Sequence, residues 1–179
     1  MDRLIMAVAT GLYSGTMPAA PGTWGSAFAL LPWYFCRGLS LGNYLIVLAG
    51  IFVVGFLTAG SAEKLLDTPD AGCIVIDEIM GMFVTLTLAP NHPLAWILGF
   101  LLFRLFDIAK PFPVSWVDSH MHGGLGIMMD DVMAGIYALI CLQLISSRPG
   151  RALRAVCRPP ARSAVGRSGH RCRPSRHPS

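Results

Sequence analysis

Charged side chains are scarce in this chain of 179 residues: Asp, Glu, Lys and Arg make up 13% of it, and hydrophobic residues make up 54%. Soluble proteins average roughly 25% charged residues. Four long stretches contain no charged residue at all, namely residues 4–36, 38–62, 79–103 and 132–147. This scarcity argues against an ordinary soluble protein. We therefore expect a membrane protein, which at this length forms one main domain.

Cysteine motifs and a cleavable signal are also missing. The five cysteines are odd in number and show no CxxC spacing, so we expect free thiols and no disulfide framework. Cys172 lies near His170, but this spacing does not match that of common zinc sites. At the N-terminus, Asp2 and Arg3 precede only a short apolar run, which does not resemble a secretory signal.

The C-terminal segment has no acidic residue. Residues 148–179 contain nine Arg, whereas residues 1–147 carry five basic and ten acidic side chains, which gives +9 and −5 for the overall net charge of +4. We therefore divide the chain into a helical membrane domain, residues 1–147, and a basic Arg- and Pro-rich tail, residues 148–179. The tail cannot build a core and is expected to be disordered. The acidic domain is what a metal-binding protein would show, and we expect no nucleic-acid partner.

Apolar runs of bilayer length are rare, since a membrane-spanning helix needs about 20 residues. Only residues 41–62 meet that length comfortably. Turn-forming residues split the first run, and Pro90 to Pro93 split the third. The sequence predicts an all-α integral membrane protein with about four to five short apolar helices. The expected helices are 24–36 with Thr23 as its cap, 41–62, 74–89, 94–109 and one from about 132 to 147, with a possible short helix at 4–12.

The polar clusters occur at alternating ends of these five predicted segments, so alternating crossings would bring them to one face. Lys and Arg in short loops favour the cytoplasm, and four of the five basic residues before the tail lie on the cluster side. We therefore expect a multi-pass membrane protein with its site facing the cytoplasm. The clusters are Pro21, Gly22 and Thr23; Glu63 and Lys64; Asp77 and Glu78; Arg104, Asp107 and Lys110; and Asp130 and Asp131.

Two pairs of adjacent acids, Asp77/Glu78 and Asp130/Asp131, each precede an apolar helix. Adjacent residues point about 100° apart on a helix, so we expect only one member of each pair to face a shared centre. Gly81 and Gly135 each follow an acid by four residues and would let two backbones approach closely. Carboxylates converging from different helices suit Mg²⁺. The alternative is that each pair only complements a helix macrodipole.

A second charged group, Arg104, Asp107 and Lys110, has the spacing of one stripe on a helix that ends before Pro111. In a soluble protein this would indicate exposed ion pairs. Beside an apolar segment we expect Asp107 to bind metal and the two basic side chains to bind phosphate. His122, before a glycine-rich stretch, is a candidate general acid, and a merely polar loop residue is the alternative.

Four motifs resemble one known family, the phosphatidylglycerophosphatase A family. They are PGTWGS at 21–26, IVIDEIMGM at 74–82, FRLFDIAKPFPVSWVD at 103–118 and HGGLGIMMDDVMAG at 122–135. The resemblance covers about residues 5–145. It implies a bacterial, Mg²⁺-dependent, all-helical enzyme of the cytoplasmic membrane. Its expected substrate is phosphatidylglycerol phosphate, which it would hydrolyse to phosphatidylglycerol and inorganic phosphate in phospholipid biosynthesis.

The resemblance and the residue chemistry together predict roles for the polar side chains. The expected metal ligands are Asp77, Glu78, Asp107, Asp130 and Asp131. Thr23, Arg104 and Lys110 would bind the phosphate. Asp107, Asp131 and His122 are the expected catalytic residues. Attack by a metal-bound water and an aspartyl-phosphate intermediate both remain open.

Two other functions fit parts of the sequence. A small divalent-cation transporter or channel would use the same acids near the middle of the bilayer. A membrane scaffold would bind partners through the basic tail and would lose its function when residues 148–179 are deleted. Neither explains why the acids, Arg104, Lys110 and the glycines gather on one predicted face. Oligomeric state leaves no signature in the sequence.

Overall fold

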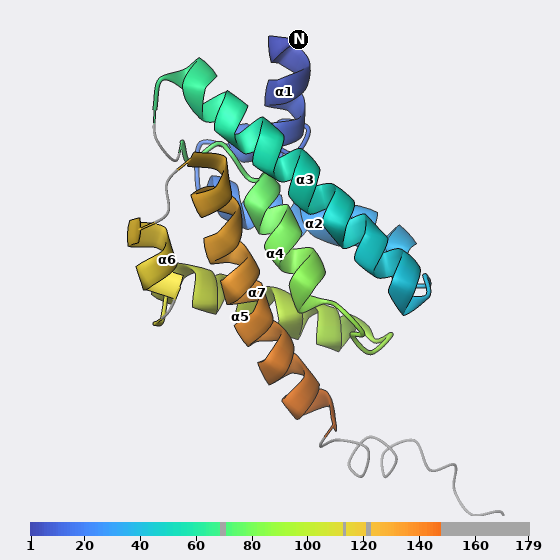
Figure 1. The fold of residues 1–179 in the computed structure, drawn as a ribbon. Coiled ribbons are helices and arrows are strands. Elements are labelled where there is room, and N and C mark those ends of the chain that lie inside the picture. Colours follow the sequence, from blue (N-terminus) through green and yellow to red (C-terminus); the bar gives the residue numbers. More distant parts are fainter. Residues whose placement is uncertain (69–70, 113, 121–122, 148–179) are drawn as a thin grey trace, which may run out of the picture. The chain divides into compact units, whose positions relative to one another are not determined.

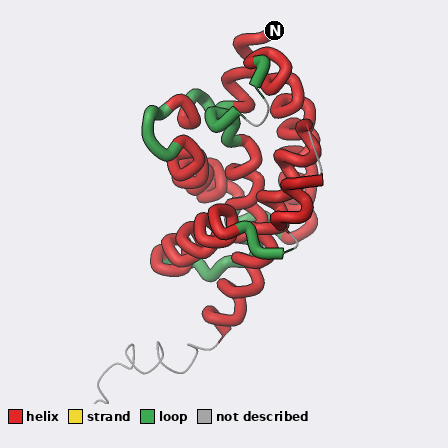
Figure 2. Tube along the Cα trace, turned by 90° about the vertical axis from the view of Figure 1, so that its left-hand side faces the viewer, coloured by secondary structure: helices red, strands yellow, loops and turns green. Residues whose placement is uncertain are grey.

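The computed structural model describes residues 1–68, 71–112, 114–120 and 123–147. Within these ranges every regular element is a helix and no strand is present (Figures 1 and 2), so the expected all-α fold is confirmed there. The basic tail lies outside the described residues. The elements are α1 (Asp2–Ala9), the 3₁₀ helix η1 (Ser14–Thr16), α2 (Pro21–Cys36), α3 (Leu41–Leu66), α4 (Ile76–Thr85), α5 (Pro93–Ala109), α6 (Val114–His120) and α7 (Gly123–Ser147).

The helices differ in number and length from the expected four to five short ones. The described residues form seven α-helices, and α3 and α7, with 26 and 25 residues, are long and apolar enough to cross a membrane. At 1.5 Å per residue they reach about 39 and 37 Å, which exceeds a hydrocarbon core of about 30 Å. The expectation of short helices was wrong for α7 because this helix begins before Asp130 and Asp131, and α3 likewise continues past Glu63 and Lys64.

Two local expectations also need correction. Thr23 does not cap α2, because the helix begins at Pro21 and Ala20 is its N-cap residue. Proline suits the first helical position, where its fixed φ and missing N–H cost nothing. The sequence also did not predict α6, a seven-residue helix between the proline-rich turn after Lys110 and the start of α7.

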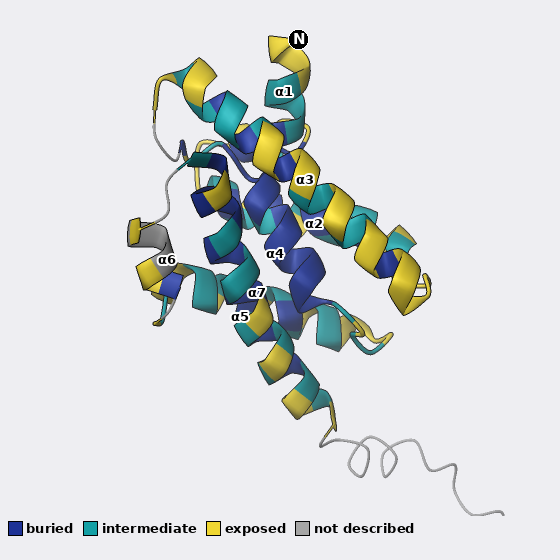
Figure 3. Ribbon diagram, in the orientation of Figure 1, coloured by how far each residue is buried: buried dark blue, intermediate teal, exposed yellow. Residues whose placement is uncertain are grey.

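The short helix α4 lies at the centre of the fold, with α2, α3, α5 and α7 packed against it (Figure 1). All of its residues except Glu78 are buried, as its dark colour in Figure 3 shows. The Tyr44 hydroxyl of α3 donates a hydrogen bond of 2.7 Å to the Phe83 carbonyl oxygen. Helix α4 is therefore a core helix, and at about 15 Å it is too short to span a bilayer.

Two glycines let α4 and α7 cross at close range. A Cβ added to Gly135 would lie 2.6 Å from the Gly81 carbonyl oxygen, and a Cβ added to Gly81 would lie 2.9 Å from the Asp131 carbonyl oxygen. The Gly81 Cβ would also overlap the ring of Phe103, which is fully buried. Any larger residue at either position would force the two helices apart. The crossing lies one turn beyond Asp77 and Asp131, so it fixes the separation of those two acids.

The outer surface of the described helices is largely apolar. Helix α3 exposes much of its length, including Ile46 and Leu57, and appears mostly yellow and teal in Figure 3. Helices α2 and α5 expose further large apolar side chains, among them Phe35 and Ile108. In water such a surface would promote aggregation. It is the surface expected of a protein that contacts lipid.

Candidate active site

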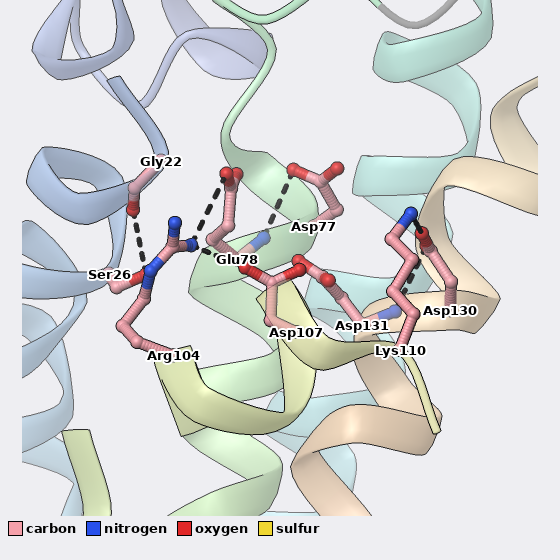
Figure 4. A network of polar contacts seen from close by, with 9 residues as sticks. All are labelled: Gly22, Ser26, Asp77, Glu78, Arg104, Asp107, Lys110, Asp130 and Asp131. Atoms are coloured by element: carbon pink, nitrogen blue, oxygen red, sulfur yellow. Dashed lines mark hydrogen bonds and ion pairs between the residues drawn. The ribbon is translucent and has the colours of Figure 1, made fainter. Parts of the chain in front are cut away.

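Three acids from two helices, of which Asp77 and Asp131 are buried and Glu78 is half-buried, form the centre of the candidate site (Figure 4). Asp77 and Glu78 lie in the first turn of α4, and Asp131 lies in the third turn of α7. One carboxylate oxygen from each of the three lies within 4.8 Å of the other two. The predicted convergence of acids from different helices is therefore present in the structure.

The two pairs of adjacent acids differ in how many of their members reach the cluster. We expected one member of each pair to face the shared centre, and this holds for Asp130 and Asp131. It is wrong for Asp77 and Glu78, which both reach the cluster. Both lie in the first turn of α4, where no preceding turn blocks the side chains from folding over the helix end. In each pair the first carboxylate accepts a 3.0 Å hydrogen bond from the backbone N–H of the second acid.

Arg104 of α5 lies beside the acid cluster. Its Nη1 is 2.6 Å from Asp107 Oδ2 and 3.9 Å from Glu78 Oε1. The side chains of Arg104 and Asp107 are only 16% and 15% exposed, so this ion pair is largely shielded from solvent. The predicted stripe on α5 is therefore correct for these two residues, and it places a guanidinium against the acids.

Lys110 takes a different direction from the other two residues of the predicted stripe. It ends α5 in a left-handed conformation with φ of 39°, so it leaves the helix. Its Nζ donates a 3.0 Å hydrogen bond to Asp130 Oδ2. This ion pair joins the end of α5 to α7, next to the acid cluster.

The N-terminus of α2 closes one side of the site. A Cβ on Gly22 would overlap Glu78 Oε1 and would lie 3.0 Å from Arg104 Nη1, so a larger residue there would displace the ends of these two side chains. The buried Ser26 hydroxyl donates a 2.7 Å hydrogen bond to the Gly22 carbonyl oxygen and fixes this turn. Sequence reasoning placed Gly22 in a cluster on the predicted site face without giving it a role, and it did not select Ser26. Their position in the PGTWGS motif was the available signal.

Two further predicted residues remain: Thr23 lies near the site, and His122 lies outside the described part of the chain. Thr23 is half-buried and directly follows Gly22 in the first turn of α2. His122 lies outside the described residues, so its predicted role as a general acid stays a prediction. Its neighbour in sequence, His120, is exposed at the end of α6 and stacks on Trp116.

Burial sets the protonation of the acids on α4. Removal from water is the main reason why the pKa of Asp77 lies well above its usual range, and the charge of Glu78 adds to this effect. Burial likewise raises the pKa of Glu78 to about 8, against the opposing influence of nearby Arg104. Without a bound cation, these raised pKa values favour the protonated forms of Asp77 and Glu78.

The donor set of the site matches the requirements of Mg²⁺. Mg²⁺ prefers oxygen ligands at about 2.0–2.1 Å, so its ligand oxygens lie within about 4.2 Å of one another. The acid oxygens lie within 4.8 Å, a separation that small side-chain rotations can close. Glu78 Oε2 and Asp131 Oδ2 are buried and make no hydrogen bond within the described part of the chain. Such uncompensated oxygens are costly unless a proton or a cation satisfies them.

The fold and the site together define a class: a protein whose described residues are helical with an apolar exterior, and in which acids, a guanidinium and an ammonium gather at one site. Comparison with known proteins identifies the family. Residues 7–146 match the family model described as Phosphatidylglycerophosphatase A. The chain therefore belongs to the phosphatidylglycerophosphatase A family, and it is a phosphatase. The resemblance noted from the four motifs is confirmed.

Individual relatives support the same assignment. The chain is 40% identical to phosphatidylglycerophosphatase A of Escherichia coli over 77% of this chain and 81% of the relative. It is 42% identical to phosphatidylglycerophosphatase A of Haemophilus influenzae over 74% and 83% of the two chains. A putative phosphatidylinositol-3-phosphatase of Bacteroides thetaiotaomicron is 38% identical over 75% and 89%. No solved structure shows a significant match.

Proposed function

We propose that this protein is a Mg²⁺-dependent lipid phosphatase that hydrolyses phosphatidylglycerol phosphate to phosphatidylglycerol and inorganic phosphate in phospholipid biosynthesis. The observation that carries the proposal is the meeting of Asp77, Glu78 and Asp131 within 4.8 Å, beside Arg104. Such a cluster offers oxygen ligands for a cation and a positive side chain for a phosphate. The names of the two phosphatidylglycerophosphatase A relatives support this substrate.

In this proposal Asp77, Glu78 and Asp131 hold Mg²⁺. Asp107 pairs with Arg104 and Asp130 pairs with Lys110, so both lie beside the metal ligands. When bound, Mg²⁺ supplies positive charge that offsets the charge of the phosphate and of the transition state. Arg104 binds phosphate oxygens from the opposite side. Its guanidinium is held at 2.6 Å by Asp107, so it is oriented before the substrate arrives. Lys110, paired with Asp130, adds a second positive charge near the rim.

The proton transfers fall to Asp107, Asp131 and His122. Either carboxylate is suited to accept a proton from an attacking water, or to attack phosphorus itself and form an aspartyl-phosphate. His122 is proposed to protonate the leaving glycerol oxygen. Thr23 is proposed to hydrogen-bond a phosphate oxygen, because it follows Gly22, which lies against Arg104 and Glu78.

We further propose that the protein crosses the bacterial cytoplasmic membrane more than once, with the site on the cytoplasmic side. Helices α3 and α7 are long and apolar enough to cross, and the relatives are bacterial. Lys64, Arg104 and Lys110 lie on the side that we assign to the cytoplasm, in agreement with the usual excess of basic residues there.

The comparisons do not support the alternative of a cation transporter, since the chain belongs to a phosphatase family. A different lipid substrate is the more relevant comparison, because one relative is named a putative phosphatidylinositol-3-phosphatase. The test must therefore present both lipids, together with a water-soluble phosphate ester.

The test measures phosphate release by purified protein in detergent micelles, with and without Mg²⁺. We expect Mg²⁺-dependent hydrolysis of phosphatidylglycerol phosphate that is lost in Asp77→Asn and Asp131→Asn. Asp67→Asn, which makes the same change at an exposed acid at the end of α3, should retain normal activity. Preference for phosphatidylinositol 3-phosphate or for the soluble ester would overturn the substrate assignment. Normal rates in both site variants would overturn the site.

A further inference from the structure

Helix α5 carries a continuous apolar stripe that no other described helix covers. Its five members are between 54% and 73% exposed. With 3.6 residues per turn they all fall within an arc of about 80°. The stripe consists of Leu94, Ile97, Leu101, Leu105 and Ile108.

One end of this α5 stripe reaches the rim of the candidate active site. Ile108 follows Arg104 by four residues, so the two side chains are neighbours on the same side of the helix. Of the ion-paired side chains at the site, Lys110 just after α5 is the most open at 30% exposed, whereas Arg104 and Glu78 are 16% and 14% exposed and Asp130 is 12% exposed. The site is therefore most accessible from the end of α5, where the α5 stripe begins.

We infer that the α5 stripe binds an acyl chain of the same lipid molecule whose phosphate lies at Arg104. This inference rests on the proposed function, which supplies a substrate with a phosphate at one end and hydrocarbon at the other. Helix α5 is divided in the same way as the lipid. Its C-terminal end carries basic residues that can bind phosphate, and no charged residue occurs between residues 79 and 103.

A second apolar surface is a weaker candidate for the acyl chain. An open groove of about 320 Å³ is lined by Pro32 of α2, Val54 of α3, and Ile79 and Phe83 of α4, among other apolar residues. The helical period places Ile79 and Phe83 on the opposite side of α4 from the centre of the acid cluster. Gly25 packs directly against Val75 between α2 and the start of α4. The groove is thus separated from the site, whereas the α5 stripe is continuous with it.

The test compares substrates that share the phosphate head but differ in acyl length. Kinetics are measured for phosphatidylglycerol phosphate with long acyl chains in mixed micelles, and for a water-soluble form with chains of a few carbons. The test variant is Leu101→Gln with Ile108→Gln on α5. The matched control is Leu57→Gln with Ile46→Gln on α3, where the two side chains are 59% and 71% exposed compared with 57% and 73% in α5.

We expect the α5 variant to raise KM for the long-chain substrate by about tenfold with kcat nearly unchanged, because it removes contacts made before and during the reaction. Hydrolysis of the short-chain substrate should be unchanged in the same variant, which also shows that the site is intact. The α3 control should behave like the wild type with both substrates.

Several results would overturn the inference. Equal losses in the α5 variant and the α3 control would show that both surfaces only anchor the protein to the micelle. Equal losses with long and short substrates would show damage to the site, and no loss at all would show that the α5 stripe is not used. If the variant instead separated a wild-type dimer without changing chain-length preference, the α5 stripe would bind a second copy. Failure of the wild type to hydrolyse either lipid would remove the proposed function itself.

Discussion

The close crossing of α4 and α7 gives the sharpest prediction, through the substitution Gly135→Ala. The added Cβ would lie 2.6 Å from the Gly81 carbonyl oxygen, so the helices must separate by about 0.8 Å to restore an ordinary contact. Overpacking of this kind costs about 1–3 kcal/mol. Replacing glycine by alanine within a helix stabilises the folded protein by about 1 kcal/mol through helix propensity. The net loss of stability should therefore be about 1 kcal/mol, or roughly 3 °C in Tm.

The matched control is Gly50→Ala in α3, where an added Cβ has no neighbour within 4 Å. This variant gains the same helix propensity without overpacking, so it should be as stable as the wild type or slightly more stable. The difference in Tm between the two variants then measures the cost of the added methyl group at the crossing of α4 and α7, without the contribution of helix propensity. Thermal unfolding in detergent with a chelator present provides the comparison.

The same separation should weaken metal binding, because Asp77 and Asp131 lie one turn from the crossing. Mg²⁺ tolerates little deviation from octahedral geometry, and a site loosened by about 1 Å commonly loses function. We expect the Mg²⁺ concentration for half-maximal activity to rise about tenfold in Gly135→Ala and to stay unchanged in Gly50→Ala. Identical Tm values and identical Mg²⁺ dependence in the two variants would refute the claim that the crossing positions the acids.

Three further predictions follow from the site. Because the folded state raises the pKa of Asp77 and brings that of Glu78 to about 8, folded protein binds more protons than unfolded protein between about pH 4.5 and 8. The Tm of the Mg²⁺-free protein should therefore fall as pH rises through this range, and Mg²⁺ should raise the Tm most near pH 8. Arg104→Gln should lower kcat by about a hundredfold with a smaller change in Tm, whereas an equal rate would contradict its role at the phosphate. Lys110→Met should lower Tm by a few degrees, because it removes the 3.0 Å ion pair to the buried carboxylate of Asp130, and Lys110→Arg should restore most of that loss.

The location of the site was predictable because charge is scarce in this chain. Acids that interrupt long apolar runs are costly unless they serve a function, and that reasoning selected Asp77, Glu78, Asp107, Asp130 and Asp131 from the sequence alone. The spacing from Asp77 to Gly81 and from Asp131 to Gly135 likewise predicted a close approach of two helices. The structure shows that crossing directly.

The lengths of the helices were less predictable. The run from residue 74 to 89 reads as one apolar helix, but the structure ends α4 at Thr85. Helix α7 begins at Gly123 although glycine disfavours helices. It does so because Gly124 packs against α3: a Cβ there would lie 2.8 Å from the Gly60 backbone nitrogen. Such tertiary contacts override local propensity and leave no periodic signal in the sequence.

The partners of individual charges were also not predictable. Periodicity placed Lys110 in line with Arg104 and Asp107, but the left-handed end of α5 turns it toward Asp130. Likewise, Glu78 reaches the cluster beside Asp77 because both stand at a helix start. Adjacent residues within a helix point about 100° apart. In the first turn no preceding turn blocks the side chains, so two adjacent side chains can reach the same point.

The most direct test of the central claim is calorimetric titration of Mg²⁺ into the purified protein in detergent, without substrate. The account predicts saturable binding by the wild type and by Asp67→Asn, and loss of that binding in Asp131→Asn. Equal Mg²⁺ binding by all three proteins would contradict the claim that Asp77, Glu78 and Asp131 form the metal site.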